Sequence, residues 1–155
     1  MPTINNQSII EDITKRLKNL IASGITDPIS STRTGSSAFV MTSFPEKRAE
    51  YPMITLRINL GASEHLGMQS EGKLIPVLLF IDVWSKNVGM KDWLAGSVFN
   101  VLRENQYGTN TTTGSGTVLE RLYDFRLLNM VDLDEPGAGG VHRKSIQCQY
   151  QFVTI

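Results

Sequence analysis

The sequence has only one cysteine, no excess of charge of either sign and no long apolar run, and each absence excludes a class of protein. Its 155 residues contain 15 lysines and arginines against 15 aspartates and glutamates, so the formal net charge is zero. Proteins that bind nucleic acid through its phosphates usually carry an excess of basic residues. Specific nucleic-acid binding is therefore not expected to be the main function.

Cys148 is the only cysteine, which excludes an intrachain disulfide and a zinc site made of four thiolates. The longest apolar run, 75–81, is much shorter than the roughly 20 residues that a membrane-spanning helix needs. The first residues, MPTINNQSIIEDITKRLK, lack the basic and apolar segments of a secretory signal peptide. We therefore expect a protein that is made and used in a reducing cytoplasm.

Sequence patterns of catalysis and metal binding are weak or incomplete. The stretch GMQSEGKL at 67–74 approaches a phosphate-binding P-loop, but Leu74 replaces the serine or threonine that ligates Mg²⁺. No G-x-S-x-G nucleophile elbow occurs, and the two histidines, His65 and His142, have no catalytic partner at a recognisable spacing. We expect no enzyme activity, no cofactor and no metal.

The first third of the chain predicts a helix and two strands. The sequence SIIE, with Ser8 as N-cap, forms a capping box, and apolar residues at helical spacing follow it. A helix is therefore predicted over 9–23, with Gly24 as its C-terminal stop. β-forming residues predict strands over 38–43 and 52–60, and strict alternation marks the second strand as half-exposed.

The centre of the chain predicts a buried strand that is followed directly by a helix. The sequence IPVLLFIDVWS is apolar on both faces up to Asp82, as expected of a central strand covered on both sides. A helix is predicted over 90–105, opened by Asn87 or Gly89. Its predicted buried stripe consists of Trp93, Leu94, Val98, Val101 and Leu102.

The last part of the chain predicts a hairpin with one apolar and one amide face. Strands are predicted over 117–131 and 141–154, on either side of the turn sequence DLDEPGAGG. One face of the closing strand carries a row of glutamine amides, which is neither core nor an ordinary charged surface. This amide face is predicted to contact another protein. In the closing strand the apolar residues are Ile146, Cys148, Tyr150 and Phe152, and they alternate with Gln147, Gln149 and Gln151.

These elements follow the order α-β-β-β-α-β-β and predict a single domain over residues 1–155. The predicted fold class is α+β, with a mainly antiparallel sheet of about five strands and two helices packed on one face. Two polar loops, 61–73 and 108–116, are longer than a hairpin needs. We predict that both are flexible and can order on a partner, the alternative being plain surface disorder.

Charged and amide residues of the predicted strands and of the first long loop are the candidate interaction residues. Basic side chains at strand positions would either pair with acidic residues of a neighbouring subunit or form ordinary solvated strand faces, and the sequence does not favour one over the other. The candidate set is Arg57, His65, Lys73, Glu120, Arg121, Asp124, Arg126, Arg143, Lys144, Gln147, Gln149 and Gln151.

The order of the elements and several short motifs resemble one known group of proteins. The pair Tyr51-Pro52 precedes a strand, the central strand ends in DVWS at 82–85, and an amphipathic helix follows directly. A strand, a glycine turn and a final strand entered through HRK at 142–144 complete the pattern. Over most of residues 8–155 the chain resembles the tail terminator, or tail completion, proteins of tailed bacteriophages, which lie at the head–tail junction.

The resemblance implies an α+β domain that assembles into a hexameric ring, caps the growing tail tube, stops its polymerisation and joins the tail to the head connector. It implies no catalytic residue to carry over. The implied partners are copies of the chain itself, the tail tube protein and the connector or neck proteins, in a virion tail or neck assembled in the host cytoplasm. DNA would pass through the ring lumen without specific binding. The two long loops depart from a compact member of the group, so the resemblance leaves open which face meets which partner.

Two other functions remain open from the sequence. One is that of another neck, head-completion or minor tail protein. The other is that of a small α+β ligand-binding domain or enzyme, whose site would lie beneath the 61–73 loop. The only plausible polar groups for such a site are His65, Lys73 and Asp82.

Overall fold

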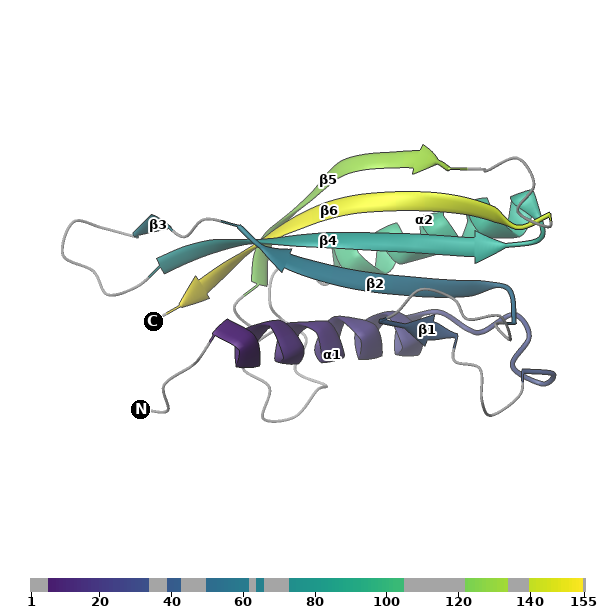
Figure 1. The fold of residues 1–155 in the computed structure, drawn as a ribbon, viewed down its shortest axis with the longest axis horizontal. Coiled ribbons are helices and arrows are strands. Elements are labelled where there is room, and N and C mark those ends of the chain that lie inside the picture. The colour runs from purple at the N-terminus through teal and green to yellow at the C-terminus, as the bar shows by residue number, and fades with distance from the viewer. Residues whose placement is uncertain are drawn as a thin grey trace.

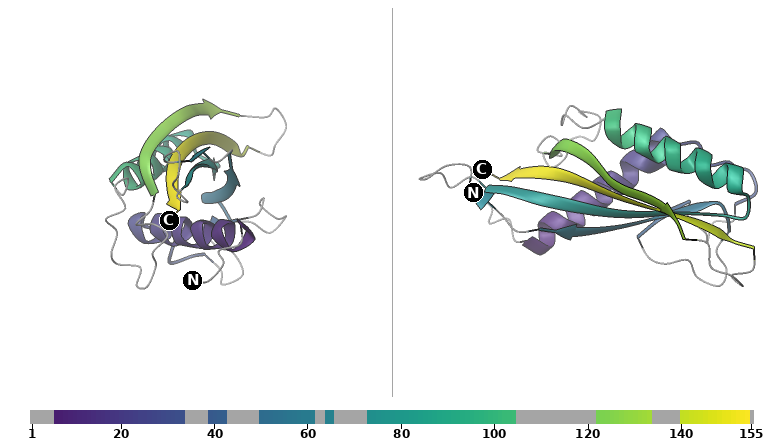
Figure 2. Two further views of the ribbon diagram at one scale, coloured as in Figure 1. Left: turned by 90° about the vertical axis from the view of Figure 1, so that its left-hand side faces the viewer. Right: turned by 90° about the horizontal axis from the view of Figure 1, so that it is seen from above.

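The described residues form one mixed sheet with two helices packed on the same face (Figures 1 and 2). The computed structural model describes residues 6–33, 39–42, 50–61, 64–65, 73–104, 122–133 and 140–154. The helices are α1 (Asn6–Gly24) and α2 (Val88–Glu104), and the strands are β1 (Val40–Met41), β2 (Met53–Leu60), β3 (Glu64–His65), β4 (Lys73–Ser85), β5 (Leu122–Asp132) and β6 (His142–Thr154).

The strand order in the sheet is β1-β2-β4-β6-β5, and β3 pairs with the beginning of β4. The β1–β2 pair is parallel, and the other pairs are antiparallel. The predicted α+β class, the order of its main elements and the central position of β4 are therefore confirmed. The segment 61–73, predicted as a loop throughout, also contains the two-residue strand β3, because Glu64 and His65 pair with Leu74 and Lys73.

Register explains why one face of the sheet is the core. Direct partners in β4 and β6 point to the same face of the sheet. On the helix-covered face these partners are apolar, for example Leu79 with Cys148 and Ile81 with Ile146. Helix α1 covers β2, and α2 covers β4 and β6 (Figure 2). The apolar alternation predicted for the last strand is confirmed, because Ile146, Cys148, Tyr150 and Phe152 are each at most 1% exposed. The hydroxyl of Tyr150 donates to the carbonyl of Leu102 at 2.9 Å, which fastens β6 to the end of α2.

Helix α1 begins earlier than predicted and ends where predicted. Its first residue is Asn6, so Ser8 lies inside the helix and is not its N-cap. Asparagine favours helix starts as serine does, and Asn5 and Asn6 precede Ser8, so the sequence SIIE alone did not fix the first residue. At the other end Gly24 has a role besides stopping the helix, because a Cβ at this position would lie 2.9 Å from Cγ2 of Val101 in α2. Gly24 therefore allows the two helices to approach.

Replacing Gly24 with alanine is expected to lower the free energy of unfolding by about 1 kcal/mol, because overpacking outweighs the gain in helix propensity. The added methyl group would lie 2.9 and 3.1 Å from the two γ-methyl carbons of Val101. Urea denaturation measures the change. Repeating the substitution in a Val101→Ala background is expected to remove most of the loss, and an equal loss in both backgrounds would exclude the contact as its cause.

Helix α2 confirms one predicted feature and corrects another. The side-chain oxygen of Asn87 accepts a hydrogen bond from the backbone N–H of Met90 at 3.0 Å, so Asn87 rather than Gly89 opens the helix. The prediction that Trp93 is buried is wrong, since 54% of this residue is exposed. At 100° per residue, position 93 points almost away from the sheet once position 91 faces it. The buried residues are Lys91, Leu94, Ala95, Val98 and Leu102.

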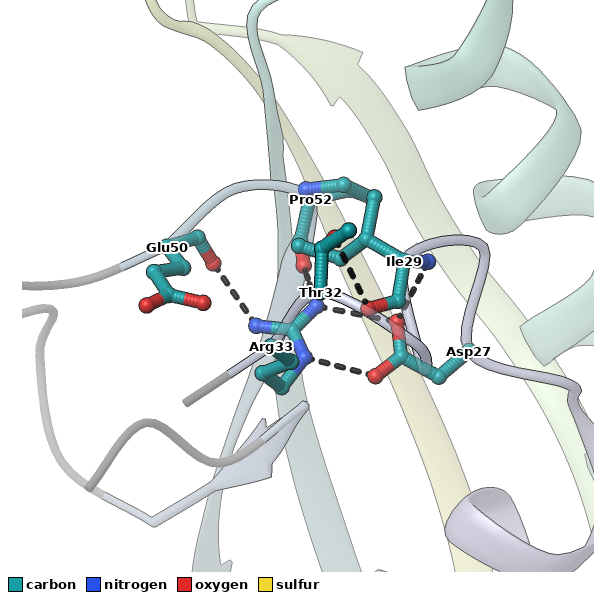
Figure 3. Close-up of polar contacts among 6 residues, drawn as sticks. All are labelled: Asp27, Ile29, Thr32, Arg33, Glu50 and Pro52. Atoms are coloured by element: carbon teal, nitrogen blue, oxygen red, sulfur yellow. Dashed lines mark hydrogen bonds and ion pairs between the residues drawn. The ribbon is translucent and has the colours of Figure 1, made fainter. Parts of the chain in front are cut away.

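Arg33 lies at the centre of a group of polar contacts after α1 (Figure 3). Its guanidinium group donates to both carboxylate oxygens of Asp27, at 2.6 and 3.0 Å, and to the carbonyls of Glu50 and Pro52, at 2.8 and 2.5 Å. The hydrogen bond from Arg33 holds the pKa of Asp27 below its usual value. We call these four residues the Arg33 network. The network ties the turn after α1 to the residues that lead into β2.

Candidate interaction surfaces

The sheet face opposite the helices, which we call the open face, is uncovered by any helix in the described part of the chain (Figure 2). The prediction that β4 is covered on both sides is therefore wrong. Leu78, Phe80 and Trp84 are only half-buried, whereas their neighbours on the other face are fully buried. From β4 and β6 the open face presents Pro76, Leu78, Phe80, Asp82, Trp84, Arg143, Ser145, Gln147, Gln149 and Gln151.

Two arginines of the open face lie over aromatic rings. The guanidinium carbon of Arg143 is 4.8 Å from the centre of the Trp84 ring, and that of Arg57 is 5.1 Å from the centre of the Phe80 ring. Arg143 also pairs with Asp82 at 3.0 Å. Stacking of this kind contributes about 0.5–1 kcal/mol at an exposed site. Both arginines are therefore oriented by contacts within the subunit.

The glutamines of β6 form a row along the middle of the open face. Gln147 and Gln149 are direct partners of Phe80 and Leu78 in β4, and Gln149 is the partner of Arg126 in β5. Each glutamine is half-buried. Amide groups both donate and accept hydrogen bonds, so a row of them beside apolar side chains is suited to an uncharged partner surface. The contact predicted for this face remains a prediction.

Lys144 lies on the helix-covered face, unlike the neighbouring Arg143. Its Nζ is 2.7 Å from a carboxylate oxygen of Asp92 in α2 and 3.7 Å from one of Asp132 in β5. The hydrogen bond with Asp92 raises the pKa of Lys144. Lys91 of α2 pairs with the same Asp132 oxygen at 2.7 Å. Together these four residues, the α2–hairpin network, join the beginning of α2 to the β5–β6 hairpin.

The other candidate residues fall at the sheet edge or outside the described residues. Asp124 and Arg126 pair at 2.9 Å within β5, and both are exposed. Asp124 has a φ of 55° and lies at an irregularity in the register between Tyr123 and Arg126. Glu120, Arg121 and the predicted loop 108–116 lie outside the described residues.

The three polar groups proposed for an enzyme site are not brought together. His65 and Lys73 are register partners, but Asp82 lies further along β4, about 30 Å away at about 3.3 Å per residue. Asp82 is engaged by Arg143 at 3.0 Å. Within the described ranges, no group of three or more His, Cys, Asp or Glu residues is arranged to hold a metal ion. Among the same residues no helix is long and apolar enough to cross a membrane.

An apolar patch at the edge of the sheet was missed from the sequence. The exposed large apolar residues of the described ranges are Val88, Trp93, Leu127, Leu128, Val131 and Leu133. Four of them lie in β5 or directly after it, and we call Leu127, Leu128, Val131 and Leu133 the β5 patch. By register the patch lines the edge from both sides, with Leu127 beside Cys148 on the helix-covered side and Val131 beside Ser145 on the open face. Strict alternation along β5 would expose only every second residue. The register shifts between Leu127 and Asn129, and both Leu127 and Leu128 are exposed. The adjacent leucines, which break the alternation, were the available signal.

No protein-family profile and no curated protein sequence matches the chain. Among solved structures, one similar chain belongs to the "Virion of native gene transfer agent (GTA) particle". The two structures superpose with a TM-score of 0.52 over 89% of this chain and 95% of the other, at 13% sequence identity. At this identity the similarity shows a shared fold.

Proposed function

We propose that the chain is a structural protein of a phage-like virion. The observation that carries the proposal is the fold shared with a chain of a gene transfer agent virion, since it extends over 89% of this chain and 95% of the other. A fold alone does not define a function. The absence of an assembled polar site among the candidate residues favours an assembly role over catalysis, because His65 and Lys73 lie far from Asp82.

Within the virion we propose the role of tail terminator. A ring of this chain would cap the tail tube, stop its polymerisation and join the tail to the head connector. The support for this finer assignment is the order of elements and the motifs around Tyr51-Pro52, 82–85 and 142–144. A closed ring repeats one heterologous contact, so each subunit needs two different complementary surfaces. The sheet offers two different edges, β1–β2 at one side and β5 at the other.

The ring is tested by the mass of the purified protein in solution and by electron microscopy of the same sample. We expect a single species of about six times 17.2 kDa and ring-shaped particles with a central channel. A monomer at all accessible concentrations would contradict the ring.

The terminator role is tested by adding the protein to polymerising tail tube protein from the same virion. Tubes are expected to stop elongating once their ends are capped, so their mean length should fall as the ring concentration rises. The connector protein added at the same concentration is the control. If rings form but tubes of unchanged length result, the chain is better assigned to another neck, head-completion or minor tail position.

A further inference from the structure

We infer that the β5 patch and the outer edge of β5 are the surface through which one copy of this chain contacts the next copy in the assembly. The inference rests on the proposed ring and identifies one of the two surfaces that close it. Strand β5 is the last strand in the order of the sheet, and no other described strand pairs with its outer edge (Figure 1). An edge of this kind presents unpaired backbone groups that favour pairing with another chain.

The stretch of β5 between its charged residues is unusually apolar for an edge strand. Leu127, Leu128, Val131 and Leu133 are 43, 51, 38 and 40% exposed. Proteins usually protect a free edge with charged side chains or proline. The stretch 127–131, LLNMV, contains neither. Such an edge is a liability in an isolated subunit and becomes buried when a neighbour covers it.

Charges around the β5 patch are already engaged within the subunit. Asp132 is held by Lys91 at 2.7 Å, and Asp124 is held by Arg126 at 2.9 Å. These charges stay exposed but are balanced within the subunit, so the edge carries little net charge. It fits a partner that is itself close to neutral, and a second copy of this chain, with a formal net charge of zero, meets this condition.

The extent of the edge also matches a contact between subunits. The strand has 11 residues and is therefore about 36 Å long at about 3.3 Å per residue. This is about twice the roughly 17–20 Å of a typical strand, so β5 offers a long edge to a neighbour. The register shift at Leu127 and Leu128 exposes adjacent leucines, so side chains as well as backbone groups are available to the neighbour.

The opposite edge of the sheet is the expected acceptor. Strand β1 has two residues and pairs only with Ile54 and Thr55, so among the described residues the rest of β2, up to Leu60, has no strand on its outer side. Contact of β5 with this side of the next copy is heterologous and continues around a ring. Contact of β5 with β5 would instead close a dimer.

The inference is tested by the reactivity of a single introduced cysteine. The native Cys148 is fully buried, and burial raises the pKa of its thiol to about 12, so it does not react with maleimide in the folded chain. Leu128→Cys places one reactive thiol in the β5 patch. Trp93→Cys is the matched control, since Trp93 is 54% exposed on the outer side of α2.

Labelling rates are compared between the ring and the dissociated subunit at low concentration. Leu128→Cys is expected to react at least about tenfold more slowly in the ring, whereas Trp93→Cys should react at nearly the same rate in both states. Equal rates for Leu128→Cys in a confirmed ring would overturn the inference and leave the proposed function standing. Absence of a ring in the unmodified protein would overturn both.

A second pair of variants tests the same surface by assembly. Leu128→Glu is expected to shift the solution mass from the ring to the single subunit, and Trp93→Glu, with the same added charge, is expected to leave the ring intact. Circular dichroism shows whether each variant is folded, and if Leu128→Glu is not, the labelling rates decide. A ring that persists with folded Leu128→Glu, or that is lost equally with Trp93→Glu, would count against the β5 patch.

Discussion

Replacing Arg33 with methionine is expected to lower the free energy of unfolding by about 3–5 kcal/mol, the loss typical of removing one partner of a buried ion pair. Only 6% of the Arg33 side chain and 16% of the Asp27 side chain are exposed. The substitution leaves the Asp27 carboxylate without its cation and the carbonyls of Glu50 and Pro52 without their donor. Methionine keeps much of the apolar length of arginine, so the loss reports on polar contacts rather than on a cavity.

The matched control for this variant is Arg126→Met. Arg126 also pairs with an aspartate, at 2.9 Å from Asp124, but these side chains are 65 and 49% exposed. Exposed pairs contribute about 0–1 kcal/mol, so this variant should be nearly as stable as the unmodified chain. Urea denaturation at one fixed protomer concentration measures both, because assembly would otherwise change the apparent stability. Equal losses would mean that the Arg33 network does not hold the entry to β2.

Local patterns were sufficient to predict the main features of the fold. Strict alternation in the last strand identified the buried side chains of β6, because the period of a strand is two whatever lies around it. The long apolar run identified β4 as the central strand, and Asn87 was one of two residues predicted to open α2. In each case the signal lies within a few neighbouring residues. The Arg33 network could not be predicted in this way, since Arg33 meets Glu50 and Pro52 across a long stretch of chain.

The candidate surfaces were harder to predict, because some large apolar residues are exposed and one lysine is buried. Trp93 was expected in the core as part of an apolar stripe at helical spacing, but the buried stripe of α2 includes Lys91, Ala95 and Leu102. A buried lysine is only acceptable if an acceptor lies within reach, and Asp132, which supplies it, is distant in sequence. Similarly, the shift in register that exposes Leu127 and Leu128 depends on how β5 meets β6. Pairing between distant segments therefore decided which apolar residues reach the surface.

Replacing Asp132 with asparagine is expected to lower the free energy of unfolding by about 2–3 kcal/mol, somewhat less than for a pair with both partners buried. Lys91 is 2% exposed, and the substitution leaves its buried ammonium group opposite a neutral amide. Asp132 itself is 54% exposed, which is why the expected loss is smaller than the loss of about 3–5 kcal/mol for a fully buried pair. The variant also removes one acceptor of Lys144.

The cause of this loss is tested by combining Asp132→Asn with Lys91→Met. Once the buried cation is replaced by an apolar side chain of similar length, the carboxylate is no longer needed, because exchanging a buried ion pair for well-packed apolar groups is often close to neutral. With the Lys91→Met single variant completing the cycle, the double variant should lose at least about 1 kcal/mol less than the sum of the two single losses, a coupling that two independent sites do not show. Losses that simply add would indicate that Lys91 and Asp132 act separately. In that case Asp132 would not be what anchors the end of β5, and with it Val131 and Leu133 of the β5 patch, to the beginning of α2.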